Sequence, residues 1–144
     1  MKAQGVPCLP LALAALIAVA GCGSDRLTTV PAGGRVILTG GDPVRLGTIE
    51  LESVEHGVTA SGKIMEDGRF TLGTYDTADG AVAGEHRVII MQMIINDGRV
   101  DHSKDHGKPV DPRFANYGTS GLTVTVGEDG STDLTIEVEP AKKR

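Results

Sequence analysis

The residues whose chemistry stands out lie in two places, a cysteine that follows a short apolar run and a later cluster of aspartates and histidines. Cys22 comes directly after the apolar run 9–20 and one glycine. The second place is the segment 101–106, with the sequence DHSKDH. A thiolate is a nucleophile that can be modified, and imidazole and carboxylate groups are ligands for divalent cations. The two places therefore suggest covalent modification and metal binding.

The histidine cluster has the spacing of a small metal site. His102 and His106 are four residues apart, so a helix would carry both on one face, with Asp101 or Asp105 as third ligand or behind the imidazoles. Glycines and prolines on both sides oppose a helix, namely Gly98, Gly107, Pro109 and Pro112. A loop loses chain entropy when it gathers ligands. The segment therefore favours a solvated loop, with metal capture as the alternative.

The same segment offers little support for catalysis. Ser103 stands beside His102 and Asp101, but adjacent residues rarely converge into a triad, and the chain has no G-x-S-x-G sequence. Calcium-loop spacing, a P-loop, a dinucleotide fingerprint, CxxC and HExxH are also absent from the sequence. We therefore predict a protein that is not an enzyme and has no catalytic residues.

The start of the chain has the features of an export signal. The apolar run 9–20 is shorter than the roughly 20 residues needed to span a bilayer, and it fits the ~7–15 residues of a signal peptide. Lys2 supplies a positive charge ahead of it. A plain secretory signal and an uncleaved short anchor are the alternatives.

Val19-Ala20-Gly21-Cys22 resembles the lipobox of bacterial lipoproteins. The resemblance implies that 1–21 is a lipoprotein signal peptide and that the Cys22 sulfur carries a diacylglyceryl group, with palmitate-type chains holding the protein on a membrane. It implies a location in the cell envelope, facing the periplasm or the exterior. Residues 22–32 would be the lipidated N-terminus and a flexible tether, whose ten residues after the cysteine reach ~33 Å. The domain would be 33–140, followed by the basic tail 141–144.

Composition limits the partners and the means of stabilisation. The formal net charge is −5, and removal of 1–21 with Lys2 makes it −6, which argues against nucleic acid as a partner. The only cysteines are Cys8, inside the predicted signal, and Cys22. The mature chain therefore has no disulfide, and an apolar core must hold the fold.

Apolar residues alternate with polar ones from Gly34 onward, and none of the segments keeps a 3.6-residue period, so the domain is predicted to be all-β. Inward-facing side chains are expected at Val36, Leu38, Ile49, Leu51, Phe70 and Leu72. Asp-Gly pairs at 67–68 and 129–130 each predict a hairpin. Seven strands are expected, at 34–39, 47–54, 57–65, 69–73, 85–95, 121–127 and 132–139.

The strand 85–95 is apolar on both sides, which predicts a central position covered on both faces, with Met91 and Met93 packed in the core. Seven short strands with these breaks predict a two-layer antiparallel sandwich. The connection 96–120 is too long for a routine hairpin and is therefore either functional or mobile.

The order of GRV at 34–36, GGDPV at 40–44, DGRFTL at 67–72 and GEHRV at 84–88 resembles carboxypeptidase-regulatory-like domains. The resemblance implies a seven-stranded, transthyretin-like (immunoglobulin-like) sandwich with a structural or interaction role and no cofactor. Its partner would be an unidentified envelope protein or polymer. His86 departs from the family, which usually has tyrosine there. As an isolated histidine at a strand start, it is expected to be a surface or half-buried side chain.

Overall fold

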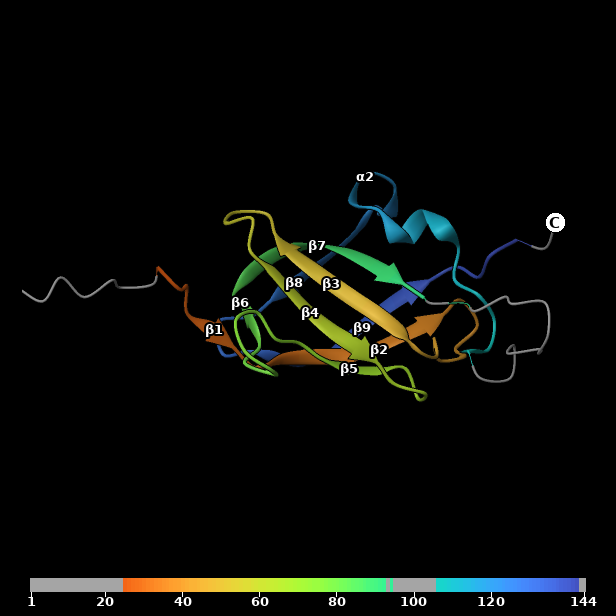
Figure 1. Cartoon of the computed structure of the whole chain (residues 1–144), viewed down its shortest axis with the longest axis horizontal. Helices are drawn as coiled ribbons and strands as arrows, with labels where there is room; N and C mark the ends of the chain where they lie inside the picture. The colour runs from red at the N-terminus through yellow and green to blue at the C-terminus, as the bar shows by residue number, and fades with distance from the viewer. Residues whose placement is uncertain (1–24, 93, 95–105, 143–144) are drawn as a thin grey trace, which may run out of the picture.

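The computed structural model describes residues 25–92, 94 and 106–142, and this part of the chain is built mainly of strands (Figure 1). Two short helical segments lie within the long connection 96–120, η1 at Pro112–Ala115 and α2 at Tyr117–Ser120. The strands are β1 Thr29–Val30, β2 Ala32–Leu38, β3 Gly47–Ser53, β4 Thr59–Ile64, β5 Arg69–Thr71, β6 Ala81–Val82, β7 Gly84–Met91, β8 Leu122–Val126 and β9 Ser131–Val138. The prediction of an all-β chain is confirmed.

The strands form two larger sheets and one small one. The four-stranded sheet has the order β4-β3-β7-β8, the three-stranded sheet β5-β2-β9, and β1 pairs with β6. Each of the seven predicted strands corresponds to one strand of the larger sheets. The sequence did not predict β1 and β6, because two residues are too few to show alternation. No helix in the described part of the chain is long and apolar enough to cross a membrane.

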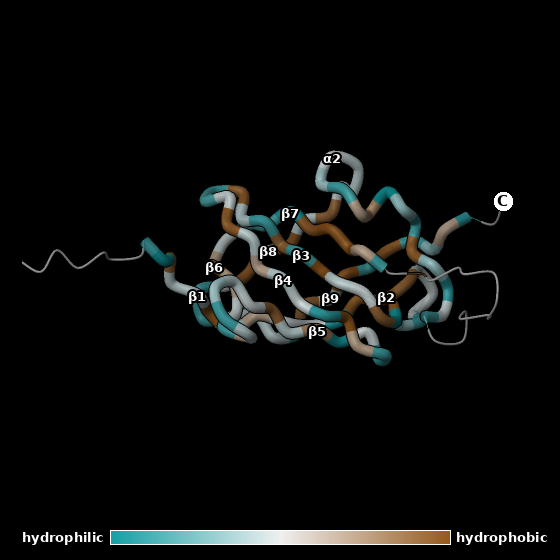
Figure 2. Tube along the Cα trace, viewed as in Figure 1, coloured by the Kyte–Doolittle hydropathy of each residue, from teal (hydrophilic) through white to brown (hydrophobic). Residues whose placement is uncertain are grey.

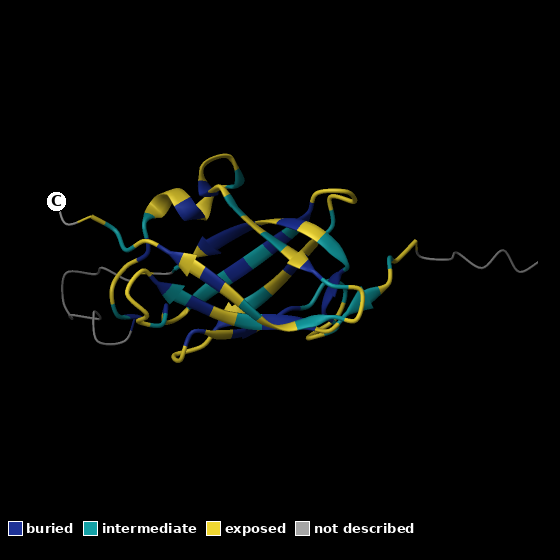
Figure 3. Cartoon of the chain, turned by 180° about the vertical axis from the view of Figure 1, so that it is seen from behind, coloured by how far each residue is buried: buried dark blue, intermediate teal, exposed yellow. Residues whose placement is uncertain are grey.

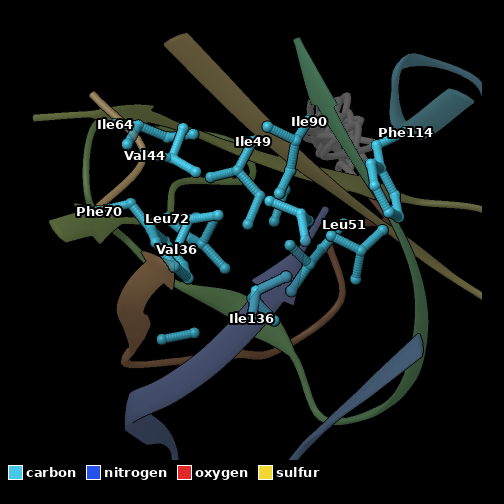
Figure 4. Packing of buried hydrophobic residues seen from close by; sticks show 14 of the residues in the cluster. Val36, Val44, Ile49, Leu51, Ile64, Phe70, Leu72, Ile90, Phe114 and Ile136 are labelled. Carbon is cyan, nitrogen blue, oxygen red and sulfur yellow. The ribbon is translucent and has the colours of Figure 1, made fainter. Parts of the chain in front are cut away.

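The two larger sheets share one aliphatic core (Figure 4). The residues predicted to face inward are all buried, with exposed fractions between 0% and 4%: Val36, Leu38, Ile49, Leu51, Phe70 and Leu72. Buried and exposed residues alternate along the strands, as do apolar and polar ones (Figures 2 and 3). Because each such side chain contributes ~1.5–3 kcal/mol on burial, the core can stabilise the fold without a disulfide.

Strand β7 is central, as predicted, but its outer face is covered only in part, since Glu85, Arg87 and Met91 are exposed there. It lies between β3 and β8, and its outward-facing Ile89 is only 6% exposed because η1 and α2 pack over this strand. The Ser120 hydroxyl donates to the Val88 carbonyl at 2.5 Å. Arg87 pairs with Glu52 and lies 5.4 Å from the centre of the Tyr117 ring. These contacts fix the helical segments on the sheet.

Core packing of Met91 was predicted wrongly. Met91 is 36% exposed because the alternation of the strand places it on the outer face with Glu85 and Arg87. Met93 lies outside the described residues.

The prediction of a wholly antiparallel fold was also wrong. Strands β2 and β9 run parallel, with Val36 opposite Ile136 and Leu38 opposite Val138. The turn after β8 carries the chain out of the four-stranded sheet, and β9 then enters the other sheet in the direction of β2. The first and last strands of the domain are therefore neighbours.

The two Asp-Gly pairs make turns, but they join different sheets rather than closing regular hairpins. The first turn is tight, with hydrogen bonds from Met65 N to Arg69 O and from Gly68 N to Met65 O. Its strands β4 and β5 belong to separate sheets, and β4 is bridged at Ser61 to Gly73, which lies two residues after the end of β5. The second turn joins β8 to β9, which lie in separate sheets. Reversal of the chain does not require that the two strands pair.

His86 is a core residue. The sequence suggested a surface or half-buried side chain, yet it is only 1% exposed, in the inward row with Val88 and Ile90. Its Nδ1 lies 3.0 Å from the Gly84 carbonyl oxygen, an acceptor, so Nδ1 carries the hydrogen. Burial lowers the pKa of His86, and the bond to Gly84 opposes this only in part.

Gly34 is expected to be indispensable to the contact between the first and last strands. A Cβ at this position would lie 1.9 Å from the Leu134 carbonyl oxygen, in a backbone that has no room to move. We expect Gly34→Ala to cost at least about 3 kcal/mol of unfolding free energy in urea denaturation. The control is Gly57→Ala, whose φ of 66° costs about 1–2 kcal/mol but whose Cβ meets nothing within 4 Å. Equal losses of unfolding free energy in Gly34→Ala and Gly57→Ala would contradict the claim that the close approach to Leu134 requires glycine at position 34.

Because of His86, the free energy of unfolding is expected to decrease as the pH is lowered. Below about pH 6.5 the unfolded chain binds a proton at this residue, whereas the folded chain resists it. The stability contributed by neutral His86 is therefore complete above that pH and is lost as pH falls toward the lowered pKa of the folded state. We expect a loss of at most about 1.4 kcal/mol per pH unit.

The measurement is urea unfolding of the wild type and of His86→Phe at about pH 7.5 and about pH 5.5. The variant should show a smaller drop between the two conditions, whatever its stability at the higher pH. An unchanged drop would assign the acid sensitivity to other groups.

Candidate functional site

The residues singled out from the sequence lie mostly outside the described part of the chain. Cys22, Asp101, His102 and Asp105 are among the residues that the structure does not describe, so acylation and metal binding stay predictions. His106 is described. Within residues 25–92, 94 and 106–142, no three histidine, cysteine, aspartate or glutamate side chains are grouped as metal ligands would be.

His106 is built into the domain. It is 8% exposed, and its Nδ1 lies 3.0 Å from the Gly107 carbonyl oxygen, which accepts the Nδ1 hydrogen. This nitrogen therefore has no lone pair to offer a metal, and His106 could bind one only through Nε2.

The Gln92 side chain ties together the segments around His106. Its Nε2 donates to the carbonyls of Arg45, at 2.8 Å, and His106, at 2.9 Å, and its Oε1 accepts from Val110 N at 2.9 Å. One amide thus satisfies backbone groups before β3 and on both sides of Gly107. Gln92 fixes this end of the domain.

At the opposite end, the segment before the first strand is bound to the loop 73–80. Arg26 forms an ion pair with Asp76 at 3.1 Å, and its guanidinium lies 5.2 Å from the centre of the Tyr75 ring. The Tyr75 hydroxyl accepts from Leu27 N at 3.0 Å. We call Arg26, Leu27, Tyr75 and Asp76 the clasp.

The clasp shortens the predicted tether. Residues 22–32 were expected to be flexible, yet from Arg26 onward this segment is bound to the domain. Strand β1 pairs with β6, with Val30 opposite Ala81, and the Pro31 carbonyl accepts from Ser131 N at 2.8 Å. The sequence did not predict this binding, because a single two-residue strand is too short to show a pattern.

A turn stabilised by the Asp79 carboxylate holds the clasp loop in shape. The two carboxylate oxygens of Asp79 accept from Thr74 N, at 2.6 Å, and from Tyr75 N, at 3.1 Å. Burial raises the pKa of Asp79, but backbone N–H groups of residues 74, 75, 76 and 79 outweigh it and leave the pKa below its usual value. A Cβ on Gly80 would lie 1.9 Å from the Val30 carbonyl oxygen, so only glycine lets the loop meet β1.

A groove of about 700 Å³ runs from the clasp loop along the edges of β4 and β5. Lys63, Arg69 and Met65 line one part of it, and Tyr75 and Asp76 line another. The outer edges of two strands from different sheets meet here. An edge strand presents backbone donors and acceptors, so the groove has the chemistry to bind an extended segment.

The sequence analysis missed Tyr75, Asp76 and Asp79. Asp79-Gly80 is an ordinary turn signal, which could have marked the loop. The bond between Leu27 and Tyr75 joins residues 48 positions apart and has no local signal.

Comparison of the chain with protein-family models, with curated proteins and with solved structures finds no match in any of the three. The function is therefore argued from the N-terminal segment and the surfaces beside it.

Asp79 is expected to stabilise the clasp loop through its backbone hydrogen bonds. Asp79→Ala removes acceptors from Thr74 N and Tyr75 N and should cost about 1–2 kcal/mol in urea unfolding. Because the pKa of Asp79 is lowered, its contribution is complete above about pH 4 and is lost as pH falls below that value. The matched control is Asp76→Ala, which removes an exposed ion pair and should cost under about 1 kcal/mol. A larger loss from the control would contradict this ranking.

Proposed function

We propose that this protein is a lipid-anchored, non-catalytic module of the cell envelope, which holds a β-sandwich domain at a membrane for contact with an envelope protein or polymer. Cys22 carries the lipid, residues 1–21 are removed, and the domain faces the periplasm or the exterior. No cofactor takes part.

The observation that carries the proposal is the junction between residues 22 and 26. A cysteine in lipobox context stands four positions before Arg26, the first residue in the described part of the chain that is bound to the domain. Two or three acyl chains hold a protein firmly, since each buried methylene contributes ~0.8 kcal/mol. An acylated Cys22 would therefore be followed almost directly by the domain.

The described architecture supports a transthyretin-like sandwich as the domain type. Two sheets pack on one core, and together these two sheets hold seven strands. Such domains have structural or interaction roles. The groove beside β4 and β5 and the outer edges of the sheets are the surfaces that suit contact with another chain.

Acylation is tested by substitution of the two cysteines in cells that export the full chain. We expect the wild type in the membrane fraction, with a mass that lacks 1–21 and gains a diacylglyceryl group, and with incorporation of labelled palmitate. Cys22→Ser should leave the membrane fraction and lose the label. Cys8→Ser is the matched control and should behave as the wild type, because Cys8 lies inside the removed segment.

Retention of 1–21, an unacylated mature N-terminus or palmitate on Cys22→Ser would each contradict anchoring at Cys22. The same cells test the interaction role by cross-linking followed by mass spectrometry. We expect a reproducible envelope neighbour of the wild type that Cys22→Ser loses. Cross-links only to abundant proteins, equal in both, would contradict display at a membrane.

A further inference from the structure

We propose that the clasp and β1 hold one end of the domain against the surface of a zwitterionic phospholipid bilayer and turn the other end outward. This orientation rests on the proposed acylation of Cys22. The membrane-facing end carries the turns 54–58 and 127–130 and the clasp loop 73–80, and we call it the near end. The far end carries the loop 39–46 and the turn 65–68.

The chain between the lipid and the domain is short. Three residues lie between Cys22 and Arg26, and the four steps along the chain that join them span no more than about 14 Å, at ~3.5 Å per step, in any conformation. The ten-residue tether expected from the sequence would have reached more than twice as far. The point where the chain enters the domain must therefore lie close to the headgroups.

The point where the chain enters the domain is fixed by its contacts. From Arg26 to Ala32 the chain is bound first by the clasp, then by β6 and then by Ser131. Gly130 also packs on this segment, since a Cβ there would lie 2.6 Å from the Pro31 carbonyl oxygen. The segment offers no hinge between the clasp and the core strand β2.

The strand pairings identify the end of the molecule that faces the lipid. Ala32 pairs with Ser131, Ser53 with His86, and Gly84 with Val126, so the turns after β3 and β8 lie beside the entry point. Figure 1 shows β1, β6 and these turns at one end of the long axis. Strand β9 then runs away from this end for eight residues, which is roughly 23 Å.

The charge of the near end favours a zwitterionic bilayer over an anionic one. The near-end loops carry carboxylates at Glu55, Asp76, Asp79, Glu128 and Asp129. The described cation of this end, Arg26, is paired with Asp76. An anionic surface would repel this end by about 1 kcal/mol per charge near the surface, whereas a zwitterionic surface does not.

Exposed apolar side chains show that the near end rests on the headgroups rather than entering the hydrocarbon. Of the large hydrophobic residues exposed in the described part of the chain, only Val54 lies at the near end. Leu46, Met65, Met91 and Ile94 adjoin the far ends of β3, β4 and β7. Leu46 even adopts a φ of 55°, unusual for leucine. The orientation presents these side chains to the envelope and not to the lipid.

Single thiols at the two ends test the orientation in the acylated, full mature protein. Asp129→Cys labels the near end and Glu66→Cys the far end, both at exposed positions. Cys22 is acylated and Cys8 removed, so each variant has one free thiol for a donor dye. The protein is inserted in phosphatidylcholine vesicles that contain an acceptor-labelled lipid.

We expect energy transfer at least about twofold stronger from position 129 than from position 66, because the two ends differ in height by roughly 23 Å. A ten-residue Gly/Ser insertion between Asp25 and Arg26 should remove most of the difference, since it adds roughly 17 Å of reach. Tyr75→Phe with Asp76→Asn, which breaks the clasp but leaves β1, should reduce the difference less than the insertion does.

Equal transfer from the two positions, or stronger transfer from position 66, would overturn the orientation. A difference that survives the insertion would overturn the role of the short tether. The mass of each vesicle-bound sample reports acylation separately, so a protein that lacks the lipid contradicts the proposed function, and an acylated protein with equal transfer contradicts only the orientation. Replacement of part of the phosphatidylcholine by phosphatidylglycerol should weaken transfer from position 129, and a stronger signal would contradict the charge argument.

Discussion

The parallel contact between β2 and β9 is the constraint on which the rest of the structure depends. It joins the first and last core strands and closes the three-stranded sheet. The approach is so close that Gly34, where the register shifts, has no room for a side chain. Because the start of β9 also binds the Pro31 carbonyl, the same contact fixes where the N-terminal segment enters the domain.

Alternation in the sequence predicted the strands well because it reports which side chains face a core. Val36, Ile49 and Leu72 are buried as predicted. Alternation carries no information on which strand lies beside which or in what direction, so the parallel pairing was missed. An Asp-Gly pair likewise predicts that the chain reverses, but the two strands that it joins can enter different sheets. His86 misled for a related reason, since a buried neutral imidazole looks like any polar residue in a sequence.

The candidate site was less predictable, because it is made by contacts between distant residues. The lipobox and the histidine cluster are local patterns and can be found by spacing alone. The clasp depends on Tyr75 meeting Leu27 and on Asp79 shaping the loop, neither of which leaves a period in the sequence. As a result, the length of the flexible segment was overestimated from the sequence, because the chain is bound to the domain from Arg26 onward.

The contacts at the N-terminal segment differ in strength, and this ranks their roles. The Arg26–Asp76 pair is exposed on both sides, and such pairs contribute about 0–1 kcal/mol, so it opens readily. The backbone bonds of Val30 and Pro31 to β6 and β9 are integral to the fold and open only when those strands separate. The clasp therefore sets how far the chain reaches before it enters the domain, whereas β1 and Pro31 set where it enters. Opening of the clasp frees a few residues but does not move the point where β1 and Pro31 join the sheets, so the proposed orientation depends on the sheets rather than on one ion pair.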